Sequence, residues 1–169
     1  MSDRSLAKAL AAEALKAASI TVPPVDLDDL AGSRGLRVER NVELGAGTRA
    51  AYRPEDGLVQ VIALPPRVER FPVAHEIGHS ILGDAGQACT EQMIMAQSEA
   101  VSLEEATRSF NPEVMASLVA SQLLIPTPWL RRAVATRTFD ELQELFDVTR
   151  PVLMIAIMRD GLLTRVRTG

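Results

Sequence analysis

The sequence contains a single cysteine, Cys89, and very few aromatic residues. One cysteine cannot form an intramolecular disulfide, so the chain suits a reducing compartment and must be stabilised by a buried core. Aromatic residues make up only 4% of the chain, so Leu, Val, Ile, Ala and Met must fill most of that core. A chain of 169 residues is long enough for this, because a domain of such length buries about 70% of the surface that it exposes when unfolded.

The sequence also lacks a long apolar run and an excess of basic residues. No stretch reaches the roughly 18 apolar residues of a membrane span, since Lys8, Glu13 and Lys16 interrupt the alanine-rich N-terminal segment. The formal net charge is −4 at pH 7, which gives no overall basic footprint for nucleic acid. We therefore expect a cytoplasmic protein that binds neither a membrane nor DNA directly.

Periodicity and capping signals predict an α+β fold. Strands are expected at residues 36–40, 48–53 and 57–63, with "PEDG" as the turn of a hairpin between the last two. Pro72 is expected in the first turn of the helix that follows these strands. Asn111 and Thr127 are expected to be the N-caps of two later helices. Helices are expected over residues 4–19, from Leu27 to Gly32 or Gly35, and over 99–108, 111–126, 127–134, 139–146 and 150–161.

The segment "RFPVAHEIGHSILGD" holds both histidines of the chain. His75 and His79 are four residues apart, so on a helix both imidazoles face the same side and can bind one cation. Glu76 follows His75 directly, where its carboxylate can reach a water without binding the metal itself. Zinc lowers the pKa of a bound water to about 7, and a neighbouring carboxylate can then act as general base in the hydrolysis of a carbonyl compound.

The same segment could be an ordinary buried helix, because Val73, Ile77 and Ile81 form an apolar stripe. That stripe lies on another face of the helix and does not compete with the histidines. No histidine is used elsewhere in the chain, which favours a metal site. Gly78 removes a side chain beside the two histidines, so a second element can pack closely there.

A catalytic zinc needs a third protein ligand, and no third histidine exists. The candidates downstream are Glu91, Glu99, Glu104, Glu105, Glu113 and the thiol of Cys89, and spacing alone does not choose among them. Glu113 is favoured because Ala116, Ser117 and Ala120 on its helix allow close packing against the histidine helix. The alternative is that Glu113 merely interacts with the positive end of its helix dipole.

Three spaced segments carry a resemblance to a known family: "PPVDLDDLA", "RFPVAHEIGHSILG" and the E-x12-P pattern of "EVMASLVASQLLIP". Over residues 5 to 160 the chain resembles the ImmA/IrrE family of metallo-endopeptidases. The resemblance implies a zincin-like core with a small antiparallel or mixed three-stranded sheet, and a metal held by His75, His79 and Glu113 with Glu76 as the catalytic acid–base. The chain departs from the family at Ser117 and Val119, where Asn and Phe are usual.

The resemblance further implies a function. Family members cleave a partner protein, typically a helix-turn-helix transcriptional repressor, which derepresses stress-response or mobile-element genes. Zn2+ is the expected metal, although two histidines and one carboxylate also accept Mn2+ or Fe2+. A rival interpretation is a non-catalytic module that binds a repressor or toxin and carries a structural metal, and a third is a DNA-binding regulator.

Several further expectations concern residues around this site. Tyr52 could stabilise an oxyanion, although packing in its strand is the simpler role. Val59 and Val61 lie in the strand nearest the motif helix in sequence, which we expect to be an edge strand that receives the substrate backbone. Cys89 could be an inhibitory fourth ligand or a small buried hydrophobe. We expect a metallopeptidase domain over residues 1–133 and a helix-turn-helix-like extension over 134–169 that packs on it.

Overall fold

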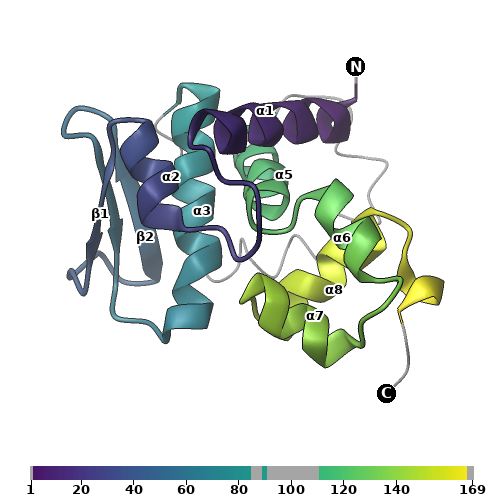
Figure 1. Ribbon diagram of the computed structural model, residues 1–169. Coiled ribbons are helices and arrows are strands. Elements are labelled where there is room, and N and C mark those ends of the chain that lie inside the picture. Colours follow the sequence, from purple (N-terminus) through teal and green to yellow (C-terminus); the bar gives the residue numbers. More distant parts are fainter. Residues whose placement is uncertain (1, 85–88, 91–110, 167–169) are drawn as a thin grey trace.

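The computed structural model describes residues 2–84, 89–90 and 111–166 (Figure 1). Within these residues the fold is α+β, as the sequence predicts. The helices are α1 (Asp3–Ala17), α2 (Leu27–Ser33), α3 (Pro66–Leu82), α5 (Pro112–Leu124), α6 (Thr127–Ala133), α7 (Phe139–Phe146), α8 (Arg150–Arg159) and the short 3-10 helix η2 (Leu163–Arg165). The strands are β1 (Arg37–Arg40), β2 (Thr48–Arg53), β3 (Leu58–Val61) and β4 (Cys89–Thr90).

The described strands form one mixed sheet in the order β1-β3-β2-β4. Strands β2 and β3 make the predicted antiparallel hairpin, β1 pairs with β3 in parallel, and the two-residue β4 adds to the outer side of β2. Gly57 closes the hairpin turn with a φ of 61°, a conformation that glycine adopts without steric cost.

The expectation that β3 is an edge strand is wrong. It lies between β1 and β2, so its backbone is paired on both sides. The side chains of Val59 and Val61 are fully buried in the core. Neither the backbone of β3 nor these two valines can therefore receive a substrate strand. Proximity in sequence to the motif helix did not determine the position of β3 in the sheet.

Helix α3 begins earlier than the sequence suggests. It starts at Pro66, directly after Pro65, so Pro72 lies inside the helix and not in its first turn. An internal proline removes one hydrogen bond and costs about 3 kcal/mol or more. The helix persists because it buries every residue from Phe71 to His79, and this burial offsets the loss.

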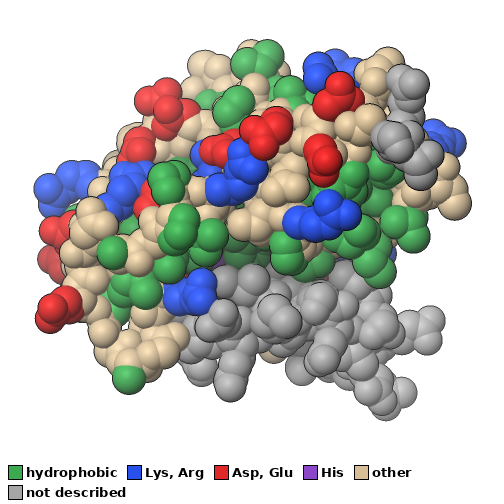
Figure 2. Space-filling model, turned by 90° about the horizontal axis from the view of Figure 1, so that it is seen from below, with side chains coloured by type: hydrophobic (Ala, Val, Ile, Leu, Met, Phe, Trp, Pro, Cys, Tyr) green, Lys and Arg blue, Asp and Glu red, His purple; other side chains and the backbone are tan. Residues whose placement is uncertain are grey.

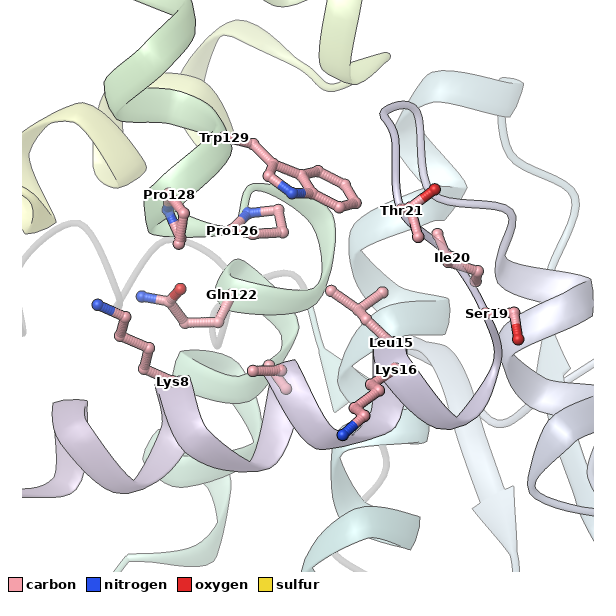
Figure 3. A pocket seen from close by; sticks show the side chains of 12 residues that line it. Lys8, Leu15, Lys16, Ser19, Ile20, Thr21, Gln122, Pro126, Pro128 and Trp129 are labelled. Carbon is pink, nitrogen blue, oxygen red and sulfur yellow. The ribbon is translucent and has the colours of Figure 1, made fainter.

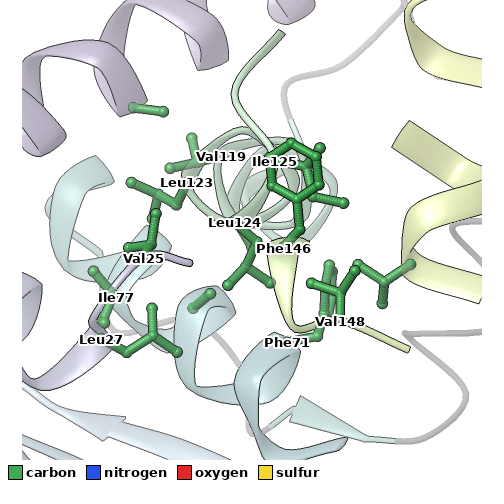
Figure 4. Close-up of a cluster of buried hydrophobic side chains, with 14 of the residues drawn as sticks. Val25, Leu27, Phe71, Ile77, Val119, Leu123, Leu124, Ile125, Phe146 and Val148 are labelled. Atoms are coloured by element: carbon green, nitrogen blue, oxygen red, sulfur yellow. The ribbon is translucent and has the colours of Figure 1, made fainter. Parts of the chain in front are cut away.

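The molecule is layered, with the sheet on one side and helices on the other (Figure 1). Helix α3 packs on β2 and β3 with one face and on α5 with another, and α1 covers α5. The buried side chains where these elements meet are almost all aliphatic, with Phe71 and Phe146 as the aromatic members (Figure 4). The core is thus mainly aliphatic, as the scarcity of aromatic residues in the sequence predicts.

The C-terminal helices share this core. Leu142 and Phe146 of α7 and Leu153 of α8 belong to the same buried cluster as Leu123 and Leu124 of α5. A division into domains at residues 133/134 stays a prediction.

Thr127 is the first residue of α6 and not its cap, a difference of one position, whereas Asn111 caps α5 as expected. The helix expected over 99–108 lies outside the described residues.

None of the helices in the described residues combines the length and apolarity that spanning a bilayer requires. On the face seen from below, the acidic and basic side chains of the described residues are interspersed and are not sorted into a patch of one sign (Figure 2).

Candidate metal centre

Helix α3 presents His75 and His79 on one face, as their spacing predicts. Both side chains are fully buried, and their Nε2 atoms lie 3.0 Å apart. The two rings meet edge to face with centroids 4.7 Å apart. Phe71, one turn before His75, lies beside its ring at a centroid distance of 6.5 Å. The imidazoles are therefore buried with both Nε2 atoms directed at the same point.

Glu113 reaches this point from the first turn of α5, 38 residues after His75. Its Oε2 atom lies 3.2 Å from the Nε2 of His75 and 3.4 Å from the Nε2 of His79. The start of α5 is well defined, because the side chain of Asn111 accepts hydrogen bonds from the backbone N–H groups of Glu113 and Val114 and Pro112 follows as the first helical residue. This cap fixes the position from which Glu113 projects.

The two helices come close because Gly78 has no side chain. A Cβ atom at Gly78 would lie 2.8 Å from the carbonyl oxygen of Ala116 and 3.2 Å from its Cα atom. Both atoms belong to the backbone of α5 and cannot move aside. The close packing expected from Gly78 and from the small residues of α5 is confirmed.

Each imidazole has a hydrogen-bond partner at its Nδ1 atom. His75 Nδ1 lies 3.0 Å from the hydroxyl oxygen of Ser117, and His79 Nδ1 lies 2.6 Å from the Oδ1 atom of Asp84. A carboxylate only accepts, so His79 carries its proton on Nδ1. Burial lowers the pKa of His75 and outweighs the raising effect of the nearby Glu113 carboxylate, which favours the neutral form of this ring.

The Nε2 atoms of the two imidazoles and one carboxylate oxygen converge, with separations of 3.0, 3.2 and 3.4 Å. Ligands about 2.0–2.1 Å from a tetrahedral zinc lie roughly 3.3 Å from one another. His75, His79 and Glu113 are the group in the described residues whose ligand atoms could hold one metal ion, all within 4.8 Å. The donor set fits a divalent cation in type and in spacing.

Glu76 lies on the same helix, directly after His75, and its side chain is fully buried. It is not part of the group of converging ligand atoms. A carboxylate beside a two-histidine, one-glutamate group, but outside it, is chemically suited to accept and donate a proton. The role of Glu76 as a general base stays a prediction.

The other sequence candidates fall elsewhere. Tyr52 is half-buried on β2 and packs at the margin of the core, so its role at an oxyanion stays a prediction. Of Cys89 the structure describes only the backbone, paired with Ala50. The remaining candidate ligands, Glu91, Glu99, Glu104 and Glu105, lie outside the described residues.

Sequence reasoning missed Asp84 and the hydrogen bond of Ser117. Asp84 follows Gly83, the residue that ends α3, and a helix-ending glycine followed by an acid is a local signal that the chain turns back there. The sequence marks Ser117 as a small residue that allows close packing and as a departure from the usual asparagine, but not as a hydrogen-bond partner of His75.

A hollow on the surface lies apart from this site. Its lining comes from α1, from the segment after it, and from the residues around the start of α6, including Leu15, Ile20, Pro126 and Trp129 (Figure 3). Among the described residues, no imidazole or carboxylate lines it, so these residues do not form a second metal centre there.

The fold and the site together define the class of protein to which this chain belongs. An H-E-x-x-H helix packed on a small sheet, with a glutamate supplied by a second helix, is the architecture of a zincin-like metallopeptidase module. Residues 33–158 match the sequence profile of the IrrE N-terminal-like domain, Peptidase_M78, and the chain belongs to this ImmA/IrrE family.

A solved structure of a Mycobacterium tuberculosis transcriptional regulator has a similar fold. It aligns with a TM-score of 0.66 at 17% sequence identity, over 89% of this chain and 55% of the regulator. The chain thus spans about half the length of the regulator. No curated protein matched this chain in sequence.

Proposed function

We propose that this protein is a metal-dependent endopeptidase that cleaves a partner protein. The observation that carries the proposal is the convergence of His75 Nε2, His79 Nε2 and Glu113 Oε2 within 3.0–3.4 Å, with the buried carboxylate of Glu76 on the same helix. Three ligands leave one position of a tetrahedral metal free for water or substrate, which is the pattern of catalytic and not of structural zinc sites.

In this proposal the residues have distinct roles. His75, His79 and Glu113 hold the cation, which we propose to be Zn2+, with Mn2+ or Fe2+ as alternatives. When bound, the cation polarises the scissile carbonyl and makes water more acidic. Glu76 takes the proton from the attacking water and returns it to the leaving amine. The burial of His75, His79 and Glu76 lowers the local dielectric and so strengthens these electrostatic interactions.

We propose a helix-turn-helix transcriptional repressor as the substrate, so that cleavage would derepress stress-response or mobile-element genes. Membership of the ImmA/IrrE family supports this substrate class. A candidate substrate is a helix-turn-helix protein encoded next to this one.

The first prediction separates metal binding from catalysis. Glu76→Gln should bind zinc as tightly as the wild type but cleave the repressor at least about 100-fold more slowly, because the general base is lost. His79→Ala should lose both zinc and cleavage. Fragments are identified by mass spectrometry after the repressor is incubated with zinc-loaded protein, and bound zinc is measured on the same samples.

A Glu76→Gln variant that cleaves at the wild-type rate would refute the mechanism. Release of the repressor from DNA without any new fragment would instead favour the rival function, a binding module in which the metal is structural. That rival has no use for an ionisable group at Glu76, so it also predicts that Glu76→Gln releases the repressor as the wild type does.

A further inference from the structure

The end of α3 returns the chain to the metal centre. Gly83 adopts a φ of 75°, in the left-handed region that glycine favours, and ends the helix there. The backbone N–H of Asp84 then donates a hydrogen bond to the carbonyl oxygen of His79 at 3.2 Å. This turn brings the side chain of Asp84 back beside the last histidine of the motif.

The carboxylate of Asp84 makes a short hydrogen bond with that histidine. Its Oδ1 atom lies 2.6 Å from His79 Nδ1, at the short end of the distances for hydrogen bonds to a charged acceptor. The side chain of His79 is fully buried, whereas that of Asp84 is 30% exposed. Asp84 thus remains partly hydrated while it binds a buried ring, and the desolvation cost of its charge is small.

The two histidines are supported differently. His75 Nδ1 has the neutral hydroxyl of Ser117 as its partner at 3.0 Å, and His79 Nδ1 has the carboxylate of Asp84. A carboxylate that accepts the Nδ1 proton fixes the tautomer and increases the electron density at Nε2, which makes the imidazole a stronger metal donor. A hydroxyl orients the ring but adds no negative charge.

We propose that Asp84 is a positioning residue of the metal centre: it holds His79 with its Nε2 lone pair directed between His75 and Glu113 and strengthens it as a metal donor. The inference rests on the proposed function, because it assumes that the three residues bind a cation. The functional motif of this chain is then longer than H-E-x-x-H and extends through the helix-ending Gly83 to Asp84.

The test compares zinc affinity in Asp84→Ala, Asp84→Asn and Ser117→Ala, measured by competition with a chromogenic chelator. Asp84→Ala should weaken zinc binding 10- to 100-fold, the usual effect of removing such a partner. Asp84→Asn keeps an acceptor but removes the charge, so its loss should be intermediate, and that of Ser117→Ala should be smaller than that of Asp84→Ala. Asp56→Asn, an exposed aspartate in the hairpin turn, is the matched control and should bind zinc as the wild type does.

Two further measurements distinguish positioning from folding. The metal-free Asp84→Asn protein should unfold at the wild-type temperature, and its Co2+ complex should show a shifted ligand-field absorption spectrum because one imidazole donor is altered. Wild-type zinc affinity in both Asp84 variants would overturn the inference and leave the proposed function intact. Failure of the wild-type protein to bind zinc at all would overturn both.

Discussion

At the scale of single residues, the distance between the two ligand-bearing helices is set by Gly78. Because Gly78 has no side chain, α3 packs directly against the backbone of α5 at Ala116. The space beside the Cα atom of Gly78 holds nothing larger than a hydrogen atom. Because Glu113 lies on α5 and both histidines lie on α3, this contact also determines how closely the three ligand atoms converge. Gly78 therefore couples helix packing to the geometry of the metal centre.

Gly78→Ala should destabilise the protein by about 1–3 kcal/mol, because the new Cβ atom would overlap the backbone of Ala116. It should also weaken zinc binding, since relief of the overlap moves Glu113 away from the histidines. Urea unfolding and chelator competition measure the two effects.

Gly32→Ala is the control for this prediction. Gly32 also lies in a helix, α2, but an added Cβ atom meets nothing within 4 Å. That substitution should stabilise the protein by about 0.5–1 kcal/mol, as alanine is favoured over glycine in helices. Equal effects of the two substitutions would show that the close approach of α3 and α5 does not constrain the molecule.

The relative positions of residues within one helix could be predicted from the sequence. His75, Glu76 and His79 are related by the turn of one helix, so their common location could be predicted. The hydrogen bond between Asp84 and His79 could not, because it depends on the left-handed turn at Gly83 and on which nitrogen of His79 faces α5.

At the scale of elements, the C-terminal end of α8 is attached to α5 and α6 through a buried ion pair. Arg159 Nη2 and Asp160 Oδ2 lie 2.8 Å apart, and the two side chains are only 5% and 7% exposed. Arg159 also donates to the hydroxyl of Ser121 and the carbonyl oxygen of Ile125, and Asp160 accepts from the hydroxyl of Thr127. The pair at the end of α8 thus satisfies polar groups of two other helices, α5 and α6.

Arg159→Met should destabilise the protein by about 3–5 kcal/mol, because it leaves the carboxylate of Asp160 buried without its cation. The effect should appear as a lower urea midpoint at neutral pH. If the double variant Arg159→Met with Asp160→Asn recovers most of the loss, the cost is confirmed to come from the unpaired charge and not from packing.

A matched comparison is Arg67→Met. Arg67 of α3 contacts Glu144 and Asp147 at the far end of α7, and the Glu144 side chain is 73% exposed. Such pairs are solvated and weakened by salt, so this substitution should change the urea midpoint little. A loss as large as that of Arg159→Met would contradict the assignment of the stabilising role to the buried pair.

Local sequence patterns predict the individual strands and helices but not how all of them pair. The strands themselves and the β2–β3 hairpin followed from alternation and the "PEDG" turn, but the interior position of β3 depends on β1 pairing alongside it in parallel. That pairing joins segments about twenty residues apart, so no local pattern indicates it. The internal Pro72 is a similar case, since tertiary burial overrides the local preference of proline.

At the scale of the whole molecule, a bound cation should stabilise the fold because its ligands come from two helices. A ligand present at 1,000 times its Kd adds about 4.1 kcal/mol to the free energy of unfolding. For a chain of this length that corresponds to a rise in Tm on the order of 10 °C. Calorimetry with EDTA and with excess zinc measures the difference.

His79→Ala is the control, and its Tm should be the same with EDTA and with zinc. A wild-type protein with no zinc-dependent shift would show that α3 and α5 are not joined through a metal. A shift of equal size in His79→Ala would assign the stabilisation to zinc bound elsewhere on the chain.

The sequence by itself determined the helix that carries His75, Glu76 and His79, the cap that starts the helix of Glu113, and the aliphatic character of the core. These follow from interactions between residues a few positions apart and from composition. Only the tertiary structure decided that Glu113 meets the two imidazoles, that Asp84 supports one of them, and that β3 lies inside the sheet. Each of these depends on packing or chain reversal in three dimensions, which the local order of residues does not specify.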